Sequence, residues 1–269
     1  MKKVVFTFCF AVLQVLYLQA QEMPAGAPPG RWVSFVHVES GLLNPSGTIR
    51  DNIAIRQNIS SFFVNQVSDG EINSTAFGIY AGLRAEYFLK KFKTGLSAGL
   101  RYINYGSEIS GFSARNADFF YLRYSMEGSD TRFARVKSMS ETTNFITIPL
   151  ELRFIPIQRK GIGLFVKAGA ELSLLNLRHS THISFQDPEM NVNEDEILQQ
   201  ISTPANKFYS TLYATAGIKF GYEGRVNYII EVFLPGSYLT KDNFSLTEVD
   251  YFEGFKLSLQ IPVFKNQNE

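Results

Sequence analysis

Apolar residues recur at every second position in several stretches of the chain. Between residues 77 and 89 they alternate with glycine, tyrosine and charged residues, and the same period of two returns at residues 96–103. Successive side chains of a β-strand point to opposite faces, so each stretch predicts a strand with one apolar and one polar face. The basic segment 90–93 joins the two strands and predicts a tight turn.

The same design repeats along the rest of the chain. Two further hairpins are predicted around the turns at residues 158–161 and 223–226, and a last alternating strand follows near the C-terminus. An irregular strand precedes them all. The eight predicted strands are residues 32–42, 77–89, 96–103, 146–154, 164–174, 212–221, 229–234 and 255–263.

Two all-β architectures fit this alternation. A soluble sandwich would turn the apolar faces inward, whereas a membrane barrel turns them toward lipid. The polar faces are rich in Gly and Tyr, as a narrow barrel interior requires. The connections also alternate strictly between short and long, and the long ones are residues 43–74, 106–143, 177–208 and 235–250. We therefore predict an eight-stranded antiparallel transmembrane up-and-down β-barrel with long external loops; the sandwich remains the less favoured alternative.

The N-terminus predicts export from the cytoplasm. Lys2 and Lys3 precede an apolar stretch that ends in Ala20, which has the form of a cleaved secretory signal peptide at residues 1–20. We expect a linker at residues 21–30, the barrel at residues 31–264 and a C-terminal tail at residues 265–269. A barrel delivered by such a signal is expected in the outer membrane.

Composition narrows the function classes. The 26 basic residues nearly balance the 25 acidic ones, so the chain lacks the basic excess typical of nucleic-acid binders. The single cysteine, Cys9, lies inside the signal, which excludes a disulfide framework or a cysteine-rich zinc site. The hydrophobic fraction of 45% and the mean hydropathy of -0.05 resemble those of a soluble protein, because lipid-facing and lumen-facing positions average out.

Several segments resemble the small outer-membrane β-barrels of Gram-negative bacteria, in particular the PorT-like group within the OmpA-like and OmpX-like architecture. They are residues 148–152 (Ile-Pro-Leu-Glu-Leu), the glycine-bearing strands 78–86 and 95–101, and the last strand, and the resemblance spans most of residues 31–264. It implies a Gram-negative outer-membrane location. Named members of the group are implicated in assembling a protein-secretion apparatus, so the resemblance also implies a secretion-associated or assembly role.

The polar strand faces place six cations and four anions in the predicted lumen. Unpaired charges in a narrow barrel would be very costly, so we expect a structural salt-bridge network rather than a conduit or a catalytic cluster. A barrel of eight strands is filled by its own side chains, which argues against an open substrate pore. The ten predicted lumen residues are Arg84, Glu86, Arg101, Glu151, Arg153, Lys167, Glu171, Lys219, Glu231 and Lys256.

The third long loop contains the other candidate chemistry. His179 and His182 lie near several carboxylates, but their spacing is weak for a metal site and a solvated acidic loop is the favoured interpretation. His179 and Ser180 also allow comparison with barrel-borne lipid hydrolases, although no orienting carboxylate is recognisable. The third histidine, His37, is expected to pack in the lumen. We predict no catalytic residue, no cofactor and no metal.

Aromatic residues are interpreted in two ways. Those near strand ends, such as Tyr105, Tyr209 and Tyr213, are expected in membrane-interface girdles. The mid-loop cluster Phe119, Phe120 and Tyr121 is instead a candidate loop binding surface. The favoured function is a non-enzymatic outer-membrane protein with a structural, adhesive or assembly role. Its expected partners are outer-membrane lipid and, at the external loops, a protein or glycan. The alternative is a lipid-modifying hydrolase.

Overall fold

A computed structural model describes most of the chain. The described residues are 34–51, 53, 55–56, 71–89, 93–112, 119–125, 131–159, 161–222 and 225–263. The predicted signal peptide, the linker at 21–30 and the tail at 265–269 lie outside them. No helix in these ranges is long and apolar enough to cross a membrane.

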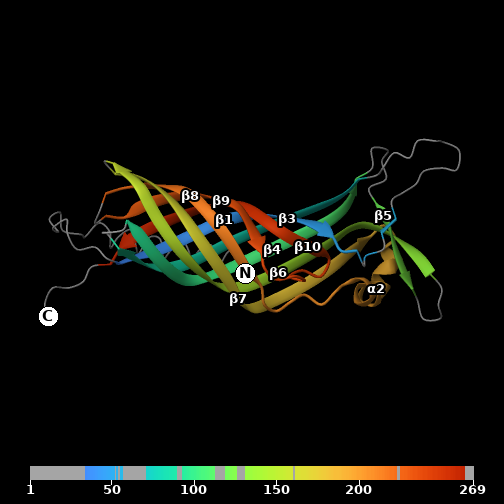
Figure 1. The fold of residues 1–269 in the computed structure, drawn as a ribbon. Coiled ribbons are helices and arrows are strands. Elements are labelled where there is room, and N and C mark those ends of the chain that lie inside the picture. Colours follow the sequence, from blue (N-terminus) through green and yellow to red (C-terminus); the bar gives the residue numbers. More distant parts are fainter. Residues whose placement is uncertain are drawn as a thin grey trace.

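Eight strands form a closed, hydrogen-bonded ring (Figure 1). Each pairs antiparallel with the ring strands before and after it in the chain, and the first pairs with the last. This arrangement confirms the predicted up-and-down barrel. The ring strands are β1 (Ser34–Ile49), β3 (Glu71–Leu89), β4 (Thr94–Phe112), β6 (Thr131–Arg159), β7 (Ile162–Phe185), β8 (Ser210–Phe220), β9 (Asn227–Tyr238) and β10 (Thr247–Pro262).

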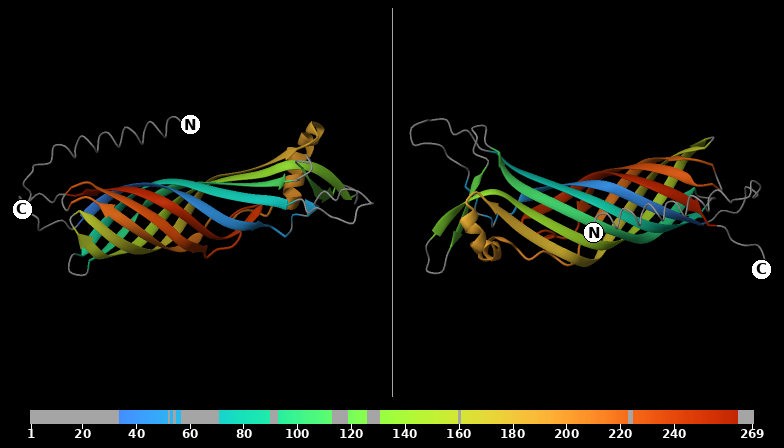
Figure 2. Two further views of the ribbon diagram at one scale, coloured as in Figure 1. Left: turned by 90° about the horizontal axis from the view of Figure 1, so that it is seen from above. Right: turned by 180° about the vertical axis from the view of Figure 1, so that it is seen from behind.

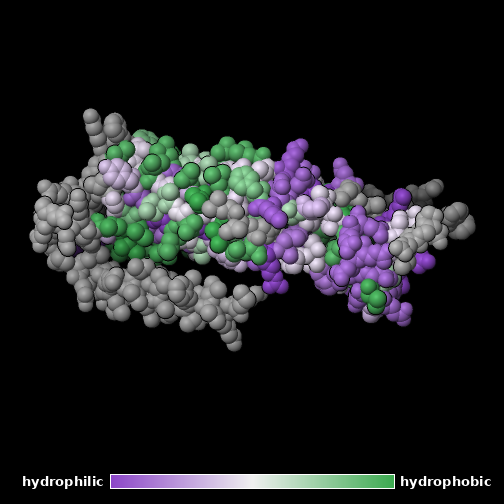
Figure 3. All heavy atoms as spheres, turned by 90° about the horizontal axis from the view of Figure 1, so that it is seen from below, coloured by the Kyte–Doolittle hydropathy of each residue, from purple (hydrophilic) through white to green (hydrophobic). Residues whose placement is uncertain are grey.

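An apolar belt surrounds the part of the barrel that lies near the short turns (Figure 3). Leu83, Leu100 and Leu152 each expose more than half of their surface. A soluble protein would bury these apolar side chains in its core. Their exposure matches the lipid-facing band of a membrane barrel. The belt consists of Phe77, Ile79, Leu83, Leu96, Leu100, Leu150, Leu152, Phe154, Leu164, Val166, Leu172, Leu212, Ile218, Ile230, Val232, Leu234, Phe255 and Leu257.

The other end of the barrel, which we call the tall end, consists of the described parts of residues 43–56, 71–76, 104–144, 177–209 and 235–254. Here β4, β6 and β7 continue well past the roughly ten residues that a barrel strand needs to cross a bilayer. The predicted loops 106–143 and 177–208 are therefore corrected, since both contain long strand segments.

The polarity of the strands inverts at the tall end, which explains this correction. On β4 the inward face changes from Ser97 and Arg101 to Ile103 and Ile109, while the outward face becomes polar. The tall end thus has an ordinary apolar interior, and its alternation continues in phase with that of the barrel. Its core consists of Ile53, Ile109, Phe120, Leu122, Tyr124, Ala134, Val136, Met139, Ile183, Phe185, Ile197, Leu198, Ile201 and Leu246.

Four short elements complete the tall end (Figure 2). The strand β5 (Phe120–Ser125) pairs with the outermost part of β6, and β2 (Ile55–Arg56) pairs with β5. The first long connection thus contributes the short strand β2, and residues 57–70 lie outside the described part. After β7 come the 3-10 helix η2 (Pro188–Asn193) and the helix α2 (Glu194–Ile201). The Gln200 amide exchanges two hydrogen bonds with the backbone of Ser125, which fixes α2 against β5.

Candidate functional site

The barrel lumen is occupied by charged side chains. The structure places all ten predicted lumen residues inside, each with at most 6% of its surface exposed. Two inward residues on β1, His37 and Glu39, are also buried. Glu39 was not among the expected lumen charges, and it brings the described lumen carboxylates to five.

Glu151 is the centre of this network. Its carboxylate accepts hydrogen bonds from Arg84 Nη1 at 2.5 Å, Lys256 Nζ at 3.0 Å and the Tyr213 hydroxyl at 2.9 Å. Lys167 Nζ lies 3.2 Å from the same carboxylate, and Arg101 lies 3.5 Å from it. One carboxylate thus holds side chains from β3, β4, β7, β8 and β10, so the ion pairs cross-link the wall of the barrel.

Glu39 and Glu231 extend the network on either side of Glu151. Glu39 accepts from Arg84 Nε at 3.2 Å and from Arg101 Nη2 at 2.7 Å. Glu231 accepts from Lys167 at 2.6 Å and lies 3.1 Å from Lys256. Shared cations therefore join the three carboxylates into one continuous cluster, which we call the Glu151 cluster.

A second group lies toward the short-turn end. Glu86 accepts from Arg153 Nη2 at 2.8 Å, from His37 Nε2 at 2.7 Å and from the Gln260 amide at 3.1 Å. The Arg153 guanidinium also lies 5.5 Å from the centre of the Phe165 ring. At the opposite end of the cluster, Glu171 accepts from Arg101 and from the Tyr209 hydroxyl.

Glycines make room for these large side chains. Arg84 faces Gly99 across the β3–β4 pair, Glu151 faces Gly169 across β6–β7, and Lys256 faces Gly41. A residue with no side chain leaves space in a narrow lumen for a long neighbour to fold across it. Further pairs of this kind are Arg101 with Gly82, Arg153 with Gly95, Lys219 with Gly163 and Glu231 with Gly217.

An aromatic layer covers the charges on the side of the tall end. Its rings meet mainly edge to face; Phe145 and Tyr209, for example, have centroids 4.7 Å apart. The girdle positions expected for Tyr105, Tyr209 and Tyr213 are corrected, because all three are buried in this layer. The layer consists of Leu43, Tyr80, Ile103, Tyr105, Phe145, Tyr209, Tyr213, Phe233, Phe244, Val249 and Phe252.

The connection between β9 and β10, residues 239–246, folds inward over this layer. Arg50 donates to the Phe244 carbonyl and, at 2.5 Å, to Asp242. The Glu141 carboxylate accepts the backbone N–H of Ser245 at 2.5 Å and that of Leu246 at 3.0 Å. We call this inward-folded segment the closing loop.

His179 contributes to holding the closing loop. Its Nε2 lies 2.6 Å from the Ser245 hydroxyl, its Nδ1 lies 2.9 Å from the Thr143 hydroxyl, and Glu141 is 3.5 Å away. Ser180, which sequence reasoning paired with His179, is exposed and is not the serine that His179 contacts. Ser245, His179 and Glu141 are adjacent, but Ser245 is 2% exposed and Glu141 is engaged by two backbone donors. The three residues therefore hold the closing loop in place rather than activate a nucleophile, and we call them the latch.

Both titratable groups of this latch lie beyond the apolar belt. Burial raises the pKa of Glu141 above its ordinary value, against the opposing effect of its two backbone hydrogen bonds. Burial lowers the pKa of His179. The second histidine, His182, contacts Glu194 at 2.6 Å. No group of three or more His, Cys, Asp or Glu side chains in the described ranges is arranged to hold a metal ion.

The candidate loop binding surface is divided between the two sides of a sheet. Phe120 points into the tall-end core and is 1% exposed, so it is not part of an external surface. Phe119 and Tyr121 lie on the outward side, with ring centroids 5.6 Å apart. The alternation of a strand accounts for this difference, which was missed when the segment was interpreted as a loop.

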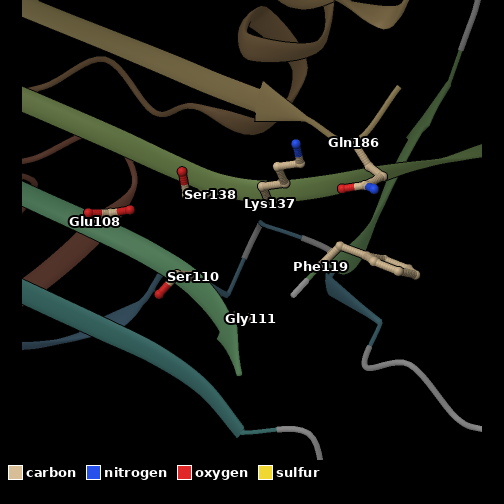
Figure 4. Close-up of a pocket in the computed structure, with 7 residues that line it drawn as sticks. All are labelled: Glu108, Ser110, Gly111, Phe119, Lys137, Ser138 and Gln186. Atoms are coloured by element: carbon tan, nitrogen blue, oxygen red, sulfur yellow. The ribbon is translucent and has the colours of Figure 1, made fainter. Parts of the chain in front are cut away.

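An open groove of about 580 Å³ lies beside Phe119 (Figure 4). Phe119, Lys137 and Gln186 gather at one end of it, while Glu108 lies toward the other. Its lining is mixed, with one aromatic ring, two charged groups of opposite sign and several hydrogen-bonding groups. The lining residues are Glu108, Ser110, Gly111, Phe119, Lys137, Ser138 and Gln186.

Comparison with known proteins assigns the sequence to a family. No curated protein matches the sequence. Among solved structures, the outer membrane protein OprG from Pseudomonas aeruginosa is similar at 9% identity with a TM-score of 0.43, covering 88% of this chain and 100% of OprG. The translocator domain of the autotransporter NalP from Neisseria meningitidis is 11% identical with a TM-score of 0.28, covering 95% of this chain and 96% of that domain. The model of the outer membrane protein beta-barrel domain matches residues 44–240. The chain therefore belongs to the outer membrane protein beta-barrel domain family.

Proposed function

We propose that this protein is a non-enzymatic outer-membrane barrel of a Gram-negative bacterium that presents a rigid interaction surface outside the cell. The signal peptide at residues 1–20 would be removed during export. The long connections of outer-membrane barrels face the exterior, so the tall end is the external end. Its role would be structural, adhesive or associated with assembly, as the PorT-like resemblance implies.

The observation that carries this proposal is the combination of a filled lumen with a folded tall end. The Glu151 cluster, the aromatic layer and the closing loop occupy successive levels of the interior. A conduit would need water or substrate along the same path. The tall end, in contrast, has its own apolar core and lies outside the belt, which supports the proposal that it meets a partner.

Conductance of the purified full chain in planar lipid bilayers tests the filled lumen. We expect no stable channel steps at neutral pH, because each level of the interior is occupied by packed or paired side chains. A regular, voltage-independent open channel would overturn the proposal. Heat-modifiable migration on gels, measured on the same preparation, verifies that the inserted protein is folded.

Labelling of intact cells tests the orientation. Cys9 lies in the predicted signal peptide, so the mature chain would carry no cysteine and a single introduced cysteine reports one position. We expect a membrane-impermeant maleimide to label Asn191→Cys on η2 in intact cells. Arg225→Cys, next to the short turn between β8 and β9, should be labelled only after lysis. The reverse pattern would show that the tall end faces the periplasm.

A further inference from the structure

The outward side of the β5–β6 sheet combines cations with aromatic rings. We call it the cation–aromatic face; it consists of Phe119, Tyr121 and Arg123 before and on β5, and Phe133, Arg135 and Lys137 on β6. The inward side of the same two strands carries Phe120, Leu122, Ala134 and Val136 in the tall-end core. The face is therefore held in place by buried side chains directly behind it.

Each cross-strand pair of residues on this face, which we call a rank, consists of one aromatic residue and one cation. Arg123 lies opposite Phe133, and Tyr121 lies opposite Arg135. One step further, Phe119 and Lys137 both line the groove. Since residues on one face of a strand repeat about every 6.6 Å, the three ranks extend over roughly 13 Å. The cation changes strand between the first rank and the second, so charge is distributed over both strands of the face.

The charge of the face is only partly neutralised. Arg135 forms a two-point ion pair with Asp187, with nitrogen to oxygen distances of 2.7 and 3.1 Å, and its guanidinium lies 5.8 Å from the centre of the Phe119 ring. Arg123 and Lys137 are exposed, and no carboxylate of the described residues forms an ion pair with either. The face therefore presents net positive charge beside flat apolar rings.

We infer that the cation–aromatic face and the adjoining groove bind an acidic polysaccharide. The apolar C–H faces of sugar rings pack on aromatic rings, and guanidinium groups bind carboxylate or phosphate substituents through two parallel hydrogen bonds. The groove supplies the amide of Gln186 and the hydroxyls of Ser110 and Ser138 for sugar hydroxyls. This inference rests on the proposed external position of the tall end, where such polymers are found.

Charge and exposure favour a glycan over a nucleic acid. A nucleic-acid surface needs a longer basic stripe, and this chain has nearly equal numbers of basic and acidic residues. The face instead provides three cations spaced between three rings. A ring beside a cation in each rank matches a polymer in which each sugar carries an acidic substituent.

Binding of fluorescent oligogalacturonate to the full chain in detergent micelles tests the inference. We expect saturable binding that neutral dextran oligosaccharides do not compete. Arg123→Gln with Lys137→Gln should weaken it by about tenfold or more, because the two exposed charge-assisted contacts are lost. Tyr121→Ala should weaken it while leaving its salt dependence unchanged, since the ring contributes packing and no charge.

Two further variants separate this face from general charge effects. The double variant Lys207→Gln with Arg225→Gln removes the same charge from exposed positions elsewhere and should bind as the wild type does. Asp187→Asn removes the carboxylate that neutralises Arg135 and should tighten binding. A structural defect would not produce this gain, and heat-modifiable migration verifies the folding of every variant.

Several results would overturn the inference. They are absence of saturable binding by the wild type, equal competition by dextran, and equal losses in the two charge-removing double variants. Stronger competition by single-stranded DNA would assign the face to nucleic acid instead. A wrong orientation of the tall end is distinguishable from failure of this inference. In that case binding in micelles would persist, while Asn191→Cys on intact cells would stay unlabelled.

Discussion

Lys256 and Glu151 are 105 residues apart in the sequence, yet the Lys256 ammonium donates to Glu151 Oε1 over 3.0 Å inside the barrel. Lys256 lies on the last strand and Glu151 on the fourth strand of the ring, so their contact spans the lumen rather than one strand pair. Such a contact requires the complete ring. The network therefore forms only when the barrel has closed.

We predict that Glu151→Gln strongly destabilises the barrel. An amide cannot balance the charges of Arg84, Lys167 and Lys256, and breaking a buried pair from one side costs about 3–5 kcal/mol. Urea unfolding of the protein in micelles, followed by heat-modifiable migration, measures the loss. Glu196→Gln on α2, where the side chain is exposed, is the matched control and should change stability by less than about 0.5 kcal/mol. Equal stability of the two variants would contradict the central place of Glu151.

The period-two pattern was sufficient to predict the ring and the ten lumen charges, but it missed Glu39. Val36 and Val38 alternate with His37 and Glu39 just as in the other strands. This strand is irregular in sequence, and only His37 on it is assigned to the lumen from the sequence. The contacts of Glu39 with Arg84 and Arg101 depend on how strands close into a ring, which no local pattern contains.

The tall end was less predictable for a different physical reason. Residues such as Ile109, Met139 and Ile183 continue the inward face of their strands, but the solvent outside changes from lipid to water. The same alternation then has the opposite polarity, and it was interpreted as the end of the strand. The depth at which this inversion occurs is set by the membrane, so a search for a single apolar face does not detect it.

We predict opposite outcomes for two glycines of β7. A methyl group on Gly169 would lie 2.5 Å from the ring of Tyr213, whose hydroxyl donates to Glu151, whereas one on Gly163 would have its nearest neighbour at 3.6 Å. Gly169→Ala should cost about 1–3 kcal/mol through overpacking. Gly163→Ala should leave the urea midpoint almost unchanged. Similar urea midpoints for the two variants would show that the lumen can accommodate a methyl group at residue 169, which would contradict the close contact with Tyr213.

We predict that Leu122→Ala loosens the tall end without unfolding the barrel. Leu122 is fully buried in the tall-end core, and such truncations cost about 2–5 kcal/mol. Limited trypsin digestion should cleave faster after Arg123, Arg132 or Arg135, while heat-modifiable migration of the barrel persists. Leu100→Ala, on the lipid-facing belt, should not accelerate this cleavage. Simultaneous loss of the barrel would show that the two regions unfold as one unit.

The closing loop should respond to pH through two groups whose contributions to loop closure change in opposite directions with pH. Burial raises the pKa of Glu141, so its contribution to loop closure is complete at low pH and is lost as the pH rises through that raised pKa. Burial lowers the pKa of His179, so its contribution is complete above the ordinary histidine pKa of about 6.5 and is lost as the pH falls through the lowered pKa. Arg50 also contacts the loop, through the Phe244 carbonyl.

Single variants should separate these two slopes. A spin label at Lys241→Cys on the closing loop reports opening as increased mobility, measured between about pH 4 and about pH 8. In His179→Gln only Glu141 titrates, and mobility should increase as the pH rises. In Glu141→Gln only His179 titrates, and mobility should increase as the pH falls below about 6.5. The wild type should show a weaker dependence than either variant, because its two contributions oppose each other. Slopes of the same sign in both variants would show that the loop is not held by this pair.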